Sequence, residues 1–319
     1  MSRRALQRGA VRAGAAVLTL LAASVLVFLV LQVLPGDPAA VMLGTEARPD
    51  TLVAMRREMG LDEPMAVRWW NWIGGFVTGD LGRSHTYDVP VADLITSRAE
   101  VSVPLALMSL TVAVGIGIPA GLFAAARHGR PADIVTMAAA QIGLSIPSFW
   151  IGILLVLLFT ILLRWMPAGG FPGWEAGPSA ALASLVLPSL ALGLPQAAVL
   201  ARVSRTAVVE TSRLDFVRTG RAGGLTRDQA ILSHALPNAL PAIVTVVGLQ
   251  FSFLIAGTVL VENVFYLPGL GRLVFQSIGA RDLPTLMSVI MLLVATVVLV
   301  NLAVDLLLLR LDPRLAARA

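Results

Sequence analysis

Few residues in this sequence have the types and spacings that enzyme chemistry requires. Cysteine is absent, which excludes disulfides, thiolate metal ligands and cysteine nucleophiles. The three histidines, His85, His128 and His234, lie far apart, and the sequence contains neither the HExxH pattern of zinc enzymes nor the GxSxG pattern of serine hydrolases. We therefore predict no catalytic residue, no metal site and no bound cofactor.

Lysine is absent as well, so all 24 basic residues are arginines. A Walker A loop places a lysine on the nucleotide phosphates, so this chain cannot bind ATP in that way. The net charge of +5 could indicate a nucleic-acid partner, but the arginines are spread along the chain and flank apolar stretches. Orientation in a membrane accounts for them better, and we predict no nucleic-acid partner.

One distinctly polar segment lies between long apolar stretches and reads RTGRAGGLTRDQAILSHALPNALPA, from Arg218 to Ala242. The stretch Val203–Arg221 overlaps the start of this segment. It alternates apolar and basic residues in a way that is compatible with a helix. Gly223 and Gly224 should end that helix, because glycine readily adopts the positive φ that terminates helices.

A second helix is predicted directly after the glycines. Thr226-Arg227-Asp228-Gln229 fits a capping box, with Thr226 as the N-cap and Gln229 as the third helical residue. The helix then continues until Pro237, which favours a bend. A short capped helix at a membrane surface is suited to docking in a groove of a partner protein, and a positively charged loop with no specific role is the alternative.

The composition predicts an integral membrane protein. Apolar residues make up 57% of the chain and charged residues only 13%, against about 25% charged residues in a soluble domain, and the mean hydropathy is +0.82. Barrels are not this hydrophobic, so we predict an all-α integral membrane fold with six transmembrane helices. The stretches free of Asp, Glu and Arg that reach the required length of about 20 residues are Ala13–Gly36, Val101–Ala126, Ile134–Leu163, Ala176–Ala201, Gln229–Val261 and Leu283–Val304.

The arginines also set the predicted orientation. They gather in the N-terminal segment, in the loop after the second span, in the polar segment and in the tail, which all lie on one side if there are six spans. The positive-inside rule makes that side cytoplasmic, so both termini are expected inside. The first apolar run exceeds the 7–15 residues of a signal-peptide core, and we expect it to be a retained helix.

The predicted division of the chain is a cytoplasmic N-terminus (1–12), a first transmembrane helix (13–36), an extracytoplasmic loop (37–100), a five-helix core (101–308) containing the cytoplasmic loop 202–236, and a cytoplasmic tail (309–319). The extracytoplasmic loop holds six arginines and ten acidic residues, so it is net negative. Within it, Thr51–Thr78 has helix-like spacing and carries Trp69, Trp70 and Trp72, which we expect at the outer interface of the membrane.

Polar residues inside the spans are candidates for function because their burial in lipid is costly. Pro147, between Ser145 and Ser148, predicts a kink that either lines a translocation path or serves packing alone. Gln141 and Gln250 could likewise face a pore or form ordinary hydrogen bonds between helices.

Residues near the ends of spans have simpler interpretations. Asn301 and Asp305 share one helix face, and we expect Asp305 to form an ion pair with an arginine such as Arg310. Glu262 and Asn263 end the fifth span at the outer surface, where either could meet a solute or a delivering protein, but we expect a capped, solvated helix terminus.

The polar segment resembles the cytoplasmic loop of ABC importer permeases, whose signature has a glycine followed thirteen positions later by the proline of a Leu-Pro pair. Gly224 and Leu236-Pro237 have that spacing. The match to the dipeptide, oligopeptide and nickel permeases covers nearly the whole chain in order. It comprises Leu34-Pro35-Gly36-Asp37-Pro38, Gly79-Asp80-Leu81-Gly82-Arg83-Ser84, Leu144-Ser145-Ile146-Pro147-Ser148-Phe149-Trp150, Leu187-Pro188-Ser189-Leu190-Ala191-Leu192-Gly193, Phe216-Val217-Arg218-Thr219, Arg221-Ala222, Gly224-Leu225, His234-Ala235-Leu236, Glu262-Asn263-Val264-Phe265, Pro268-Gly269-Leu270-Gly271 and Leu311-Asp312-Pro313-Arg314.

The resemblance implies a type I ABC importer permease fold with a cytoplasmic coupling helix, in a multi-pass protein of the bacterial inner (plasma) membrane. Such a permease, embedded in membrane lipid, forms with a second homologous permease subunit a pathway for peptides or a related small solute. It works with two ABC ATPase subunits and an extracytoplasmic solute-binding protein. The resemblance assigns ATPase coupling to Arg218, Arg221, Ala222, Gly224, Leu225, Thr226, Leu236 and Pro237.

Two glycines depart from the family pattern. Gly220 and Gly223 stand where the family more often has alanine and lysine, and each lowers helix propensity by up to about 1 kcal/mol, so we expect a looser end of the first loop helix. A self-sufficient secondary transporter or channel is the alternative function. It would need intramembrane charges, and only Asp305 and residues at span ends qualify.

Overall fold

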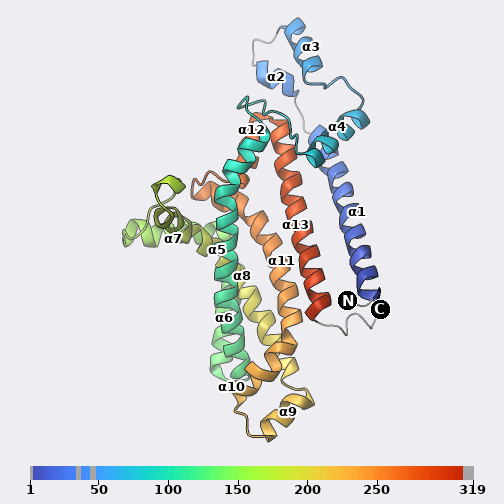
Figure 1. Ribbon diagram of the computed structural model, residues 1–319. Helices are drawn as coiled ribbons and strands as arrows, with labels where there is room; N and C mark the ends of the chain where they lie inside the picture. Colours follow the sequence, from blue (N-terminus) through green and yellow to red (C-terminus); the bar gives the residue numbers. More distant parts are fainter. Residues whose placement is uncertain (1–2, 34–36, 44–47, 312–319) are drawn as a thin grey trace. The chain divides into compact units, whose positions relative to one another are not determined.

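The computed structural model describes residues 3–33, 37–43 and 48–311. In this part of the chain the regular secondary structure is helical, apart from one isolated bridge between Arg83 and Pro90 (Figure 1). The motif residues 34–36 and 312–314 lie outside the described residues. The chain divides into two compact units. Unit 1 comprises Met1–Arg12, Val103–Leu267 and Val300–Ala319, and unit 2 comprises Ala13–Ser102 and Pro268–Leu299.

The helices follow one another closely along the chain. They are α1 (Arg3–Val33), α2 (Pro38–Leu43), α3 (Pro49–Glu58), α4 (Met65–Thr78), α5 (Val91–Ala126), α6 (Pro131–Ser145), α7 (Ser148–Leu155), the π-helix η2 (Val156–Leu162), the 3₁₀ turn η3 (Trp174–Ala176), α8 (Pro178–Thr211), α9 (Asp215–Ala222), α10 (Arg227–Ala230), the π-helix η4 (Ile231–Ala235), α11 (Leu236–Val264), α12 (Leu270–Ala280) and α13 (Leu283–Leu311).

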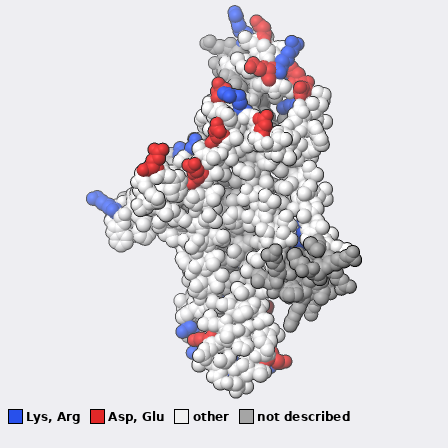
Figure 2. All heavy atoms as spheres, in the orientation of Figure 1, with Lys and Arg blue, Asp and Glu red and all other residues white. Residues whose placement is uncertain are grey.

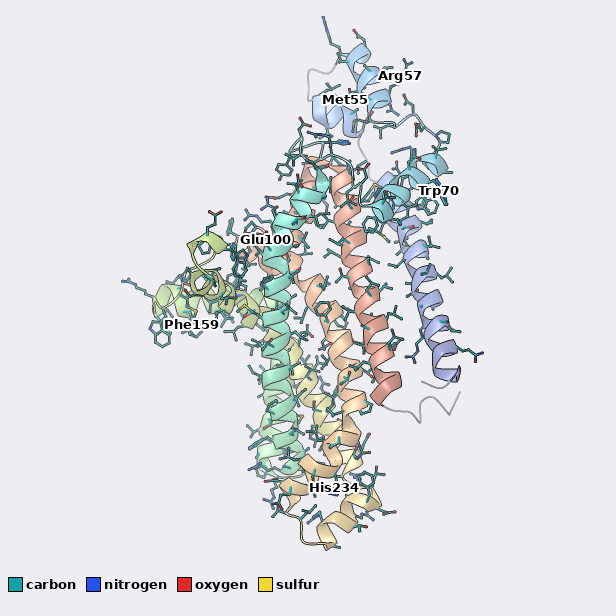
Figure 3. The ribbon with its side chains drawn as sticks, viewed as in Figure 1. Met55, Arg57, Trp70, Glu100, Phe159 and His234 are labelled. Carbon is teal, nitrogen blue, oxygen red and sulfur yellow. The ribbon has the colours of Figure 1, made fainter. Side chains whose placement is uncertain are left out.

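Five helical runs in the described part of the chain are long and apolar enough to cross a membrane. They are Gly9–Gln32, Val91–Ala126, Pro178–Thr211, Arg227–Val264 and Leu283–Leu308, and they match five of the six predicted spans. The second begins at Val91 rather than residue 101, because α5 continues through charged residues that include Glu100 (Figure 3). Asp93 lies in its first turn, where a carboxylate interacts favourably with the helix dipole.

The third predicted span, Ile134–Leu163, is not one straight helix. Its halves, α6 and α7 with η2, meet at 98°, and Figure 1 shows α7 leaving the helices of unit 1. The break falls at Ile146, whose φ of −98° and ψ of 123° are extended, because the ring of Pro147 disfavours helical backbone in the residue before it. The kink predicted at Pro147 is confirmed, as a break in the helix.

Two helices of unit 1 approach each other closely. Gly117 and Gly121 lie on one face of α5, and a Cβ on either would be 2.5 Å from a backbone oxygen of α8, that of Ala197 or Ala201 respectively. Small residues four apart let membrane helices approach to backbone contact. The string GIPAG (117–121) is the sequence signal of this contact, and the sequence interpretation missed it.

Two of the polar residues predicted inside the spans of unit 1, Gln250 and Asp305, pair with other side chains. Gln250 is buried and its Nε2 donates to Gln196 Oε1 on α8 at 2.6 Å, which favours the interhelical hydrogen bond over a pore-facing role. Asp305 forms an ion pair with Arg12 at 3.6 Å. The ion pair of Asp305 with an arginine is thus confirmed. The side chain of Arg310, the arginine given as an example, lies outside the described residues.

The end of α11 is packed rather than solvated. Glu262 is fully buried, and Asn263 Nδ2 donates to the backbone oxygen of Val259 at 2.7 Å. Gly170, in the loop between η2 and η3, donates its N–H to the oxygen of Phe265 at 2.8 Å. This loop therefore covers the end of α11. The expectation of a solvated helix end is therefore wrong at Glu262.

Unit 2 has an apolar core to which the tryptophans of α4 contribute. Trp72 stacks on Phe28 of α1 with ring centroids 6.3 Å apart, and Trp69 Nε1 donates to Ser24 Oγ at 3.3 Å. Both tryptophans pack against the core, whereas Trp70 is 68% exposed (Figure 3). The predicted interfacial position thus suits Trp70 alone of the three.

Buried Asp282 fixes the loop after α4 to the start of α13 in unit 2. Its Oδ2 accepts hydrogen bonds from Ser84 Oγ at 2.5 Å and Thr285 Oγ1 at 2.8 Å, and its Oδ1 accepts one from the N–H of His85 at 3.2 Å. A carboxylate that accepts several hydrogen bonds at a helix N-terminus is well stabilised. The Gly79–Ser84 motif is thereby held in place.

The close contact between α5 and α8 predicts a destabilising glycine substitution. We expect Gly121→Ala to lower the free energy of unfolding by about 1–3 kcal/mol, since the added methyl overpacks a backbone contact. Gly115→Ala on the same helix is the control, because a Cβ there meets nothing within 4 Å. Thermal unfolding of the purified proteins in detergent measures the difference, and equal melting temperatures would contradict the close contact.

Candidate functional site

The polar segment forms two short helices at one end of unit 1 (Figure 1). α8 ends at Thr211 and α9 begins at Asp215, so the predicted helix Val203–Arg221 is interrupted. Leu214 is the extended N-cap of α9, with φ −72° and ψ 149°. The Ser212 hydroxyl donates to the backbone oxygen of Val208 at 2.6 Å, a bond that competes with the helical pattern.

The two glycines after α9 differ in conformation. Gly223 caps the helix with φ −77°, and its N–H donates to the oxygen of Thr219 at 2.9 Å. Gly224 has φ +100°, a region that is strained for residues with a side chain. The predicted helix end is confirmed, and the turn depends on Gly224.

Gly220 lies inside α9 and faces the second half of the segment. A Cβ at this position would lie 3.3 Å from Leu225 Cδ1 and 3.4 Å from His234 Nε2. α9 continues through this glycine to Ala222. The glycine permits a close approach of α9 to η4.

The capping box at the second helix is confirmed. Gln229 donates its backbone N–H to Thr226 Oγ1 at 3.3 Å, and Gln229 Oε1 accepts the N–H of Thr226 at 3.0 Å. Both bonds satisfy amide groups that the first helical turn leaves free. The start of α10 is therefore fixed by its own sequence.

No break separates this second helix from the membrane span. α10 continues through η4 into α11, and Arg227–Val264 is one run of 38 residues. In the π-helical turn the N–H of Leu236 donates to the oxygen of Ile231, five residues back. Pro237, which has no N–H to contribute, sits in the first turn of α11. The bend expected at Pro237 therefore does not divide the second helix from the span.

An apolar cluster attaches the segment to the other helices of unit 1. Val217 of α9 and Ile231 and Ala235 of η4 are buried with Ala125 of α5 and Val208 of α8. Since each of these side chains is at most 5% exposed, the segment is packed as part of unit 1. A surface loop with no fixed structure would not bury such a cluster.

A buried ion pair fixes the turn between α5 and α6 to α8. Asp133 Oδ1 accepts a hydrogen bond from Arg205 Nε at 2.5 Å, and its Oδ2 accepts one from Arg205 Nη2 at 2.7 Å. The same carboxylate accepts the N–H of Gly129 at 3.0 Å and lies 3.3 Å from His128 Nδ1. A bidentate arginine–carboxylate pair has a specific geometry. The sequence interpretation missed it, since the partners lie far apart in the chain.

The structure brings the predicted coupling residues together and separates them from the other candidates. Arg218, Arg221, Ala222, Gly224, Thr226 and Pro237 are exposed, and Leu225 and Leu236 are half-buried. Figure 3 shows His234 at the same end of unit 1, and charged side chains of unit 1 are visible there in Figure 2. Gln141, Ser145 and Pro147 lie around the end of α6 and are exposed in this chain, while Gln250 lies inside.

Comparisons with known proteins agree with this geometry. Residues 117–317 match the family described as the binding-protein-dependent transport system inner membrane component, and residues 6–106 match the N-terminal part of such membrane components. The chain belongs to this family. It is the permease subunit of an ABC importer, a multi-pass inner-membrane protein that works with an ATPase and a binding protein and is not itself the catalyst.

Relatives and solved structures support the same assignment. The glutathione transport system permease protein GsiC of Escherichia coli (strain K12) is 40% identical over 295 residues, 92% of this chain and 94% of GsiC. A Brucella suis protein with the provisional name peptide transport system permease protein is 39% identical over 303 residues, 95% of this chain and 96% of its own. The inward-facing MetNI methionine ABC transporter is similar in fold, with a TM-score of 0.57, 21% identity, and coverage of 69% of this chain and 96% of its own. The predicted all-α permease fold is confirmed.

The ion pair of Asp133 predicts an unequal effect of two conservative substitutions. Asp133→Asn should lower the free energy of unfolding by about 1–3 kcal/mol, because it leaves the part-buried Arg205 guanidinium without its charged partner. Asp215→Asn is the control, since the exposed pair with Arg218 spans 3.8 Å and such pairs contribute about 0–1 kcal/mol. Thermal unfolding in detergent compares them, and an equal, small effect would show that the pair is dispensable.

Proposed function

We propose that the segment from Ser212 to Pro237 is the surface through which ABC ATPase subunits drive this permease. The observation that carries the proposal is the unbroken helical run from Arg227 to Val264. A displacement applied to α10 reaches the membrane part of α11 without a flexible joint. Arg218, Arg221, Ala222, Gly224, Leu225, Thr226, Leu236 and Pro237 are the coupling residues in this proposal.

The apolar side chains on the segment support a protein partner. Leu214 is 50% exposed, Phe216 is 41% exposed and Leu232 is 59% exposed, although the surrounding surface is polar. Exposed apolar side chains with a polar surround are typical of protein interfaces. An ATPase subunit that covered them would bury the apolar area and leave the arginines at the rim.

The proposed assembly has this chain and a second homologous permease subunit in the membrane lipid, two ABC ATPase subunits on the cytoplasmic side, and a solute-binding protein outside. The positive-inside rule supports a cytoplasmic position for the polar segment and both termini in this proposal. The proposed pathway between the two permeases passes Gln141, Ser145 and Pro147. These residues lie in α6 or at the break that follows it, and they are exposed in the single subunit.

The proposed solutes are small peptides, including glutathione-like tripeptides. The names of the similar proteins from Escherichia coli and Brucella suis refer to glutathione and to peptides. The identity of about two residues in five extends over nearly the whole chain, so it includes both the core and the extracytoplasmic region that a delivered solute meets first.

Substitution of the two neighbouring glycines tests the coupling proposal. We expect Gly224→Ala to reduce peptide uptake by roughly tenfold, because a side chain at φ +100° costs about 1–3 kcal/mol and distorts the turn that presents α10. Gly223→Ala should leave uptake unchanged, since φ is −77° and a Cβ there has its nearest contact at 3.4 Å.

Uptake of a labelled peptide into cells that express the whole transporter is the measurement, with the amount of permease in the membrane quantified beside it. Equal uptake by both variants at equal membrane levels would contradict the coupling role of this turn.

A further inference from the structure

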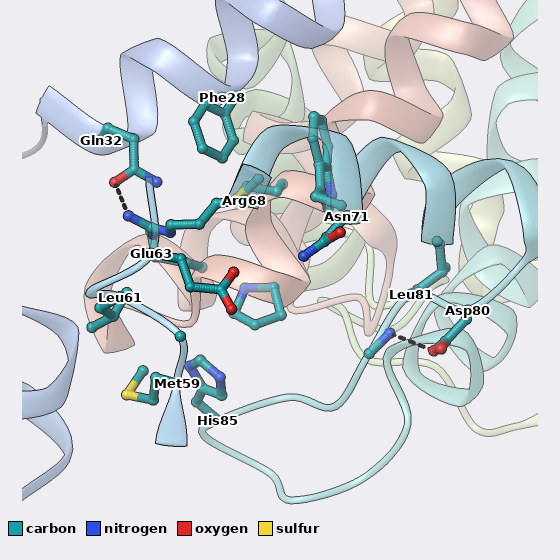
Figure 4. Close-up of a pocket in the computed structure, with 17 residues that line it drawn as sticks. Phe28, Gln32, Met59, Leu61, Glu63, Arg68, Asn71, Asp80, Leu81 and His85 are labelled. Carbon is teal, nitrogen blue, oxygen red and sulfur yellow. Dashed lines mark hydrogen bonds between the residues drawn. The ribbon is translucent and has the colours of Figure 1, made fainter. Parts of the chain in front are cut away.

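Unit 2 contains a cavity of about 380 Å³ that the coupling proposal does not use (Figure 4). The end of α1, the turn before α4, α4 itself, the loop after α4 and the start of α13 all contribute to its wall. Phe28, Trp72 and Met287 supply apolar surface, and Gln32, Glu63, Arg68 and Asn71 supply polar groups. Small-molecule sites have volumes of about 300–1,000 Å³ and this mixture of apolar wall and few polar groups.

Arg68 is a half-buried cation without a carboxylate partner in the described part of the chain. Its Nη1 donates to the neutral Gln32 Oε1 at 3.2 Å, and its guanidinium carbon lies 5.9 Å from the centre of the Phe28 ring. Burial lowers the pKa of Arg68 and the charge of Glu63 opposes that shift. A guanidinium remains protonated at neutral pH, so the cavity wall carries a positive charge that no ion pair among the described residues neutralises.

Further polar groups of the wall lack partners within the described residues. Gln32 Nε2 and Trp72 Nε1 are buried donors without an acceptor, and His85 Nδ1 is buried without a partner. Burial lowers the pKa of His85, and the charge of Asp282 opposes that shift. Buried polar groups are nearly always hydrogen-bonded in native proteins.

The opposite charge is also present in the cavity. The exposed Glu63 lines it, and Figure 4 shows its carboxylate and the Asn71 amide pointing toward the same space. Glu63 forms no ion pair with Arg68 in the described structure, although its charge acts on that guanidinium. Two opposite charges that share a cavity without pairing can each bind one end of an amphoteric solute.

We propose that this cavity binds a small solute that carries both a carboxylate and an ammonium group, with Arg68 at the carboxylate and Glu63 at the ammonium. The volume exceeds what one side chain of a docked protein would fill, which favours a free peptide of two or three residues. The inference rests on the proposed function, since it gives that importer a contact site for its peptide within the permease itself.

Saturation-transfer difference NMR on the detergent-extracted transporter, purified without the solute-binding protein, tests the cavity directly. The probes are alanyl-alanine, its C-terminal amide and its N-acetyl derivative. We expect saturation transfer to alanyl-alanine, and at least a fivefold weaker signal for the amide. Arg68→Gln should abolish the response, and Glu63→Gln should weaken it for alanyl-alanine but not for the N-acetyl derivative.

Arg57→Gln is the matched control, because Arg57 lies on α3 (Figure 3), is exposed and does not line the cavity. An equal response of Arg68→Gln and Arg57→Gln, an equal signal from the amide, or displacement by inorganic phosphate at equal concentration would each overturn the proposal. If Arg68→Gln does not fold, Gln32→Leu is the second variant and should weaken the response, since it removes the acceptor that holds the Arg68 guanidinium and nearly preserves size.

The result is independent of ATPase coupling. Gly224→Ala should retain the NMR response while uptake falls, because Gly224 lies in unit 1 and the cavity in unit 2. Loss of uptake in Gly224→Ala with an intact NMR response supports both proposals. Loss of uptake in Gly224→Ala with no NMR response in the parent protein rejects the cavity alone, and normal uptake with an intact NMR response rejects the coupling role alone.

Discussion

The helix that starts at the Thr226 cap is part of the polar segment and also packs into the apolar core of unit 1. The packing therefore fixes which face of this helix can contact another protein. Ile231 and Ala235 are buried in that core, while Thr226 and Leu232 face outward. One face of the same helix therefore serves packing and the other remains available. The π-helical turn at η4 keeps the helix continuous at Pro237. Proline has no backbone N–H, and the turn places it where no backbone donor is required.

Unit 1 contains a buried ion pair, although charged residues are scarce in this chain. Only 13% of the residues are charged, and two of them form the ion pair between Asp133 and Arg205. This pair fixes the start of α6 to the end of α8. The neighbouring α5 and α8 already meet at Gly121 and Ala201. Together these contacts make a rigid frame beside the polar segment, so that α9 and α10 are presented by packed helices.

Much of the fold could be predicted from the sequence because it depends on local signals. The apolar stretches predict the spans, Thr226 and Gln229 predict a helix start, and Pro147 predicts a break. Contacts between distant residues carry no such local signal. The pairs Asp133–Arg205 and Ser84–Asp282 join residues that no spacing rule connects, and the burial of Glu262 depends on a loop that folds over it. The position of the proposed coupling segment was predictable, but its continuity with α11 was not, since proline usually bends or ends a helix.

The most direct test of the coupling account uses the absence of cysteine from the chain. A single cysteine at Leu232, which is 59% exposed on η4, is labelled with a benzophenone maleimide in membranes that contain the complete transporter, and the photo-adducts are identified by mass spectrometry. Phe275, 63% exposed on α12 in the predicted extracytoplasmic connection, is the matched position. The account predicts an ATPase adduct from Leu232→Cys and none from Phe275→Cys. Absence of the ATPase adduct at Leu232, or an equal yield at both positions, would contradict it.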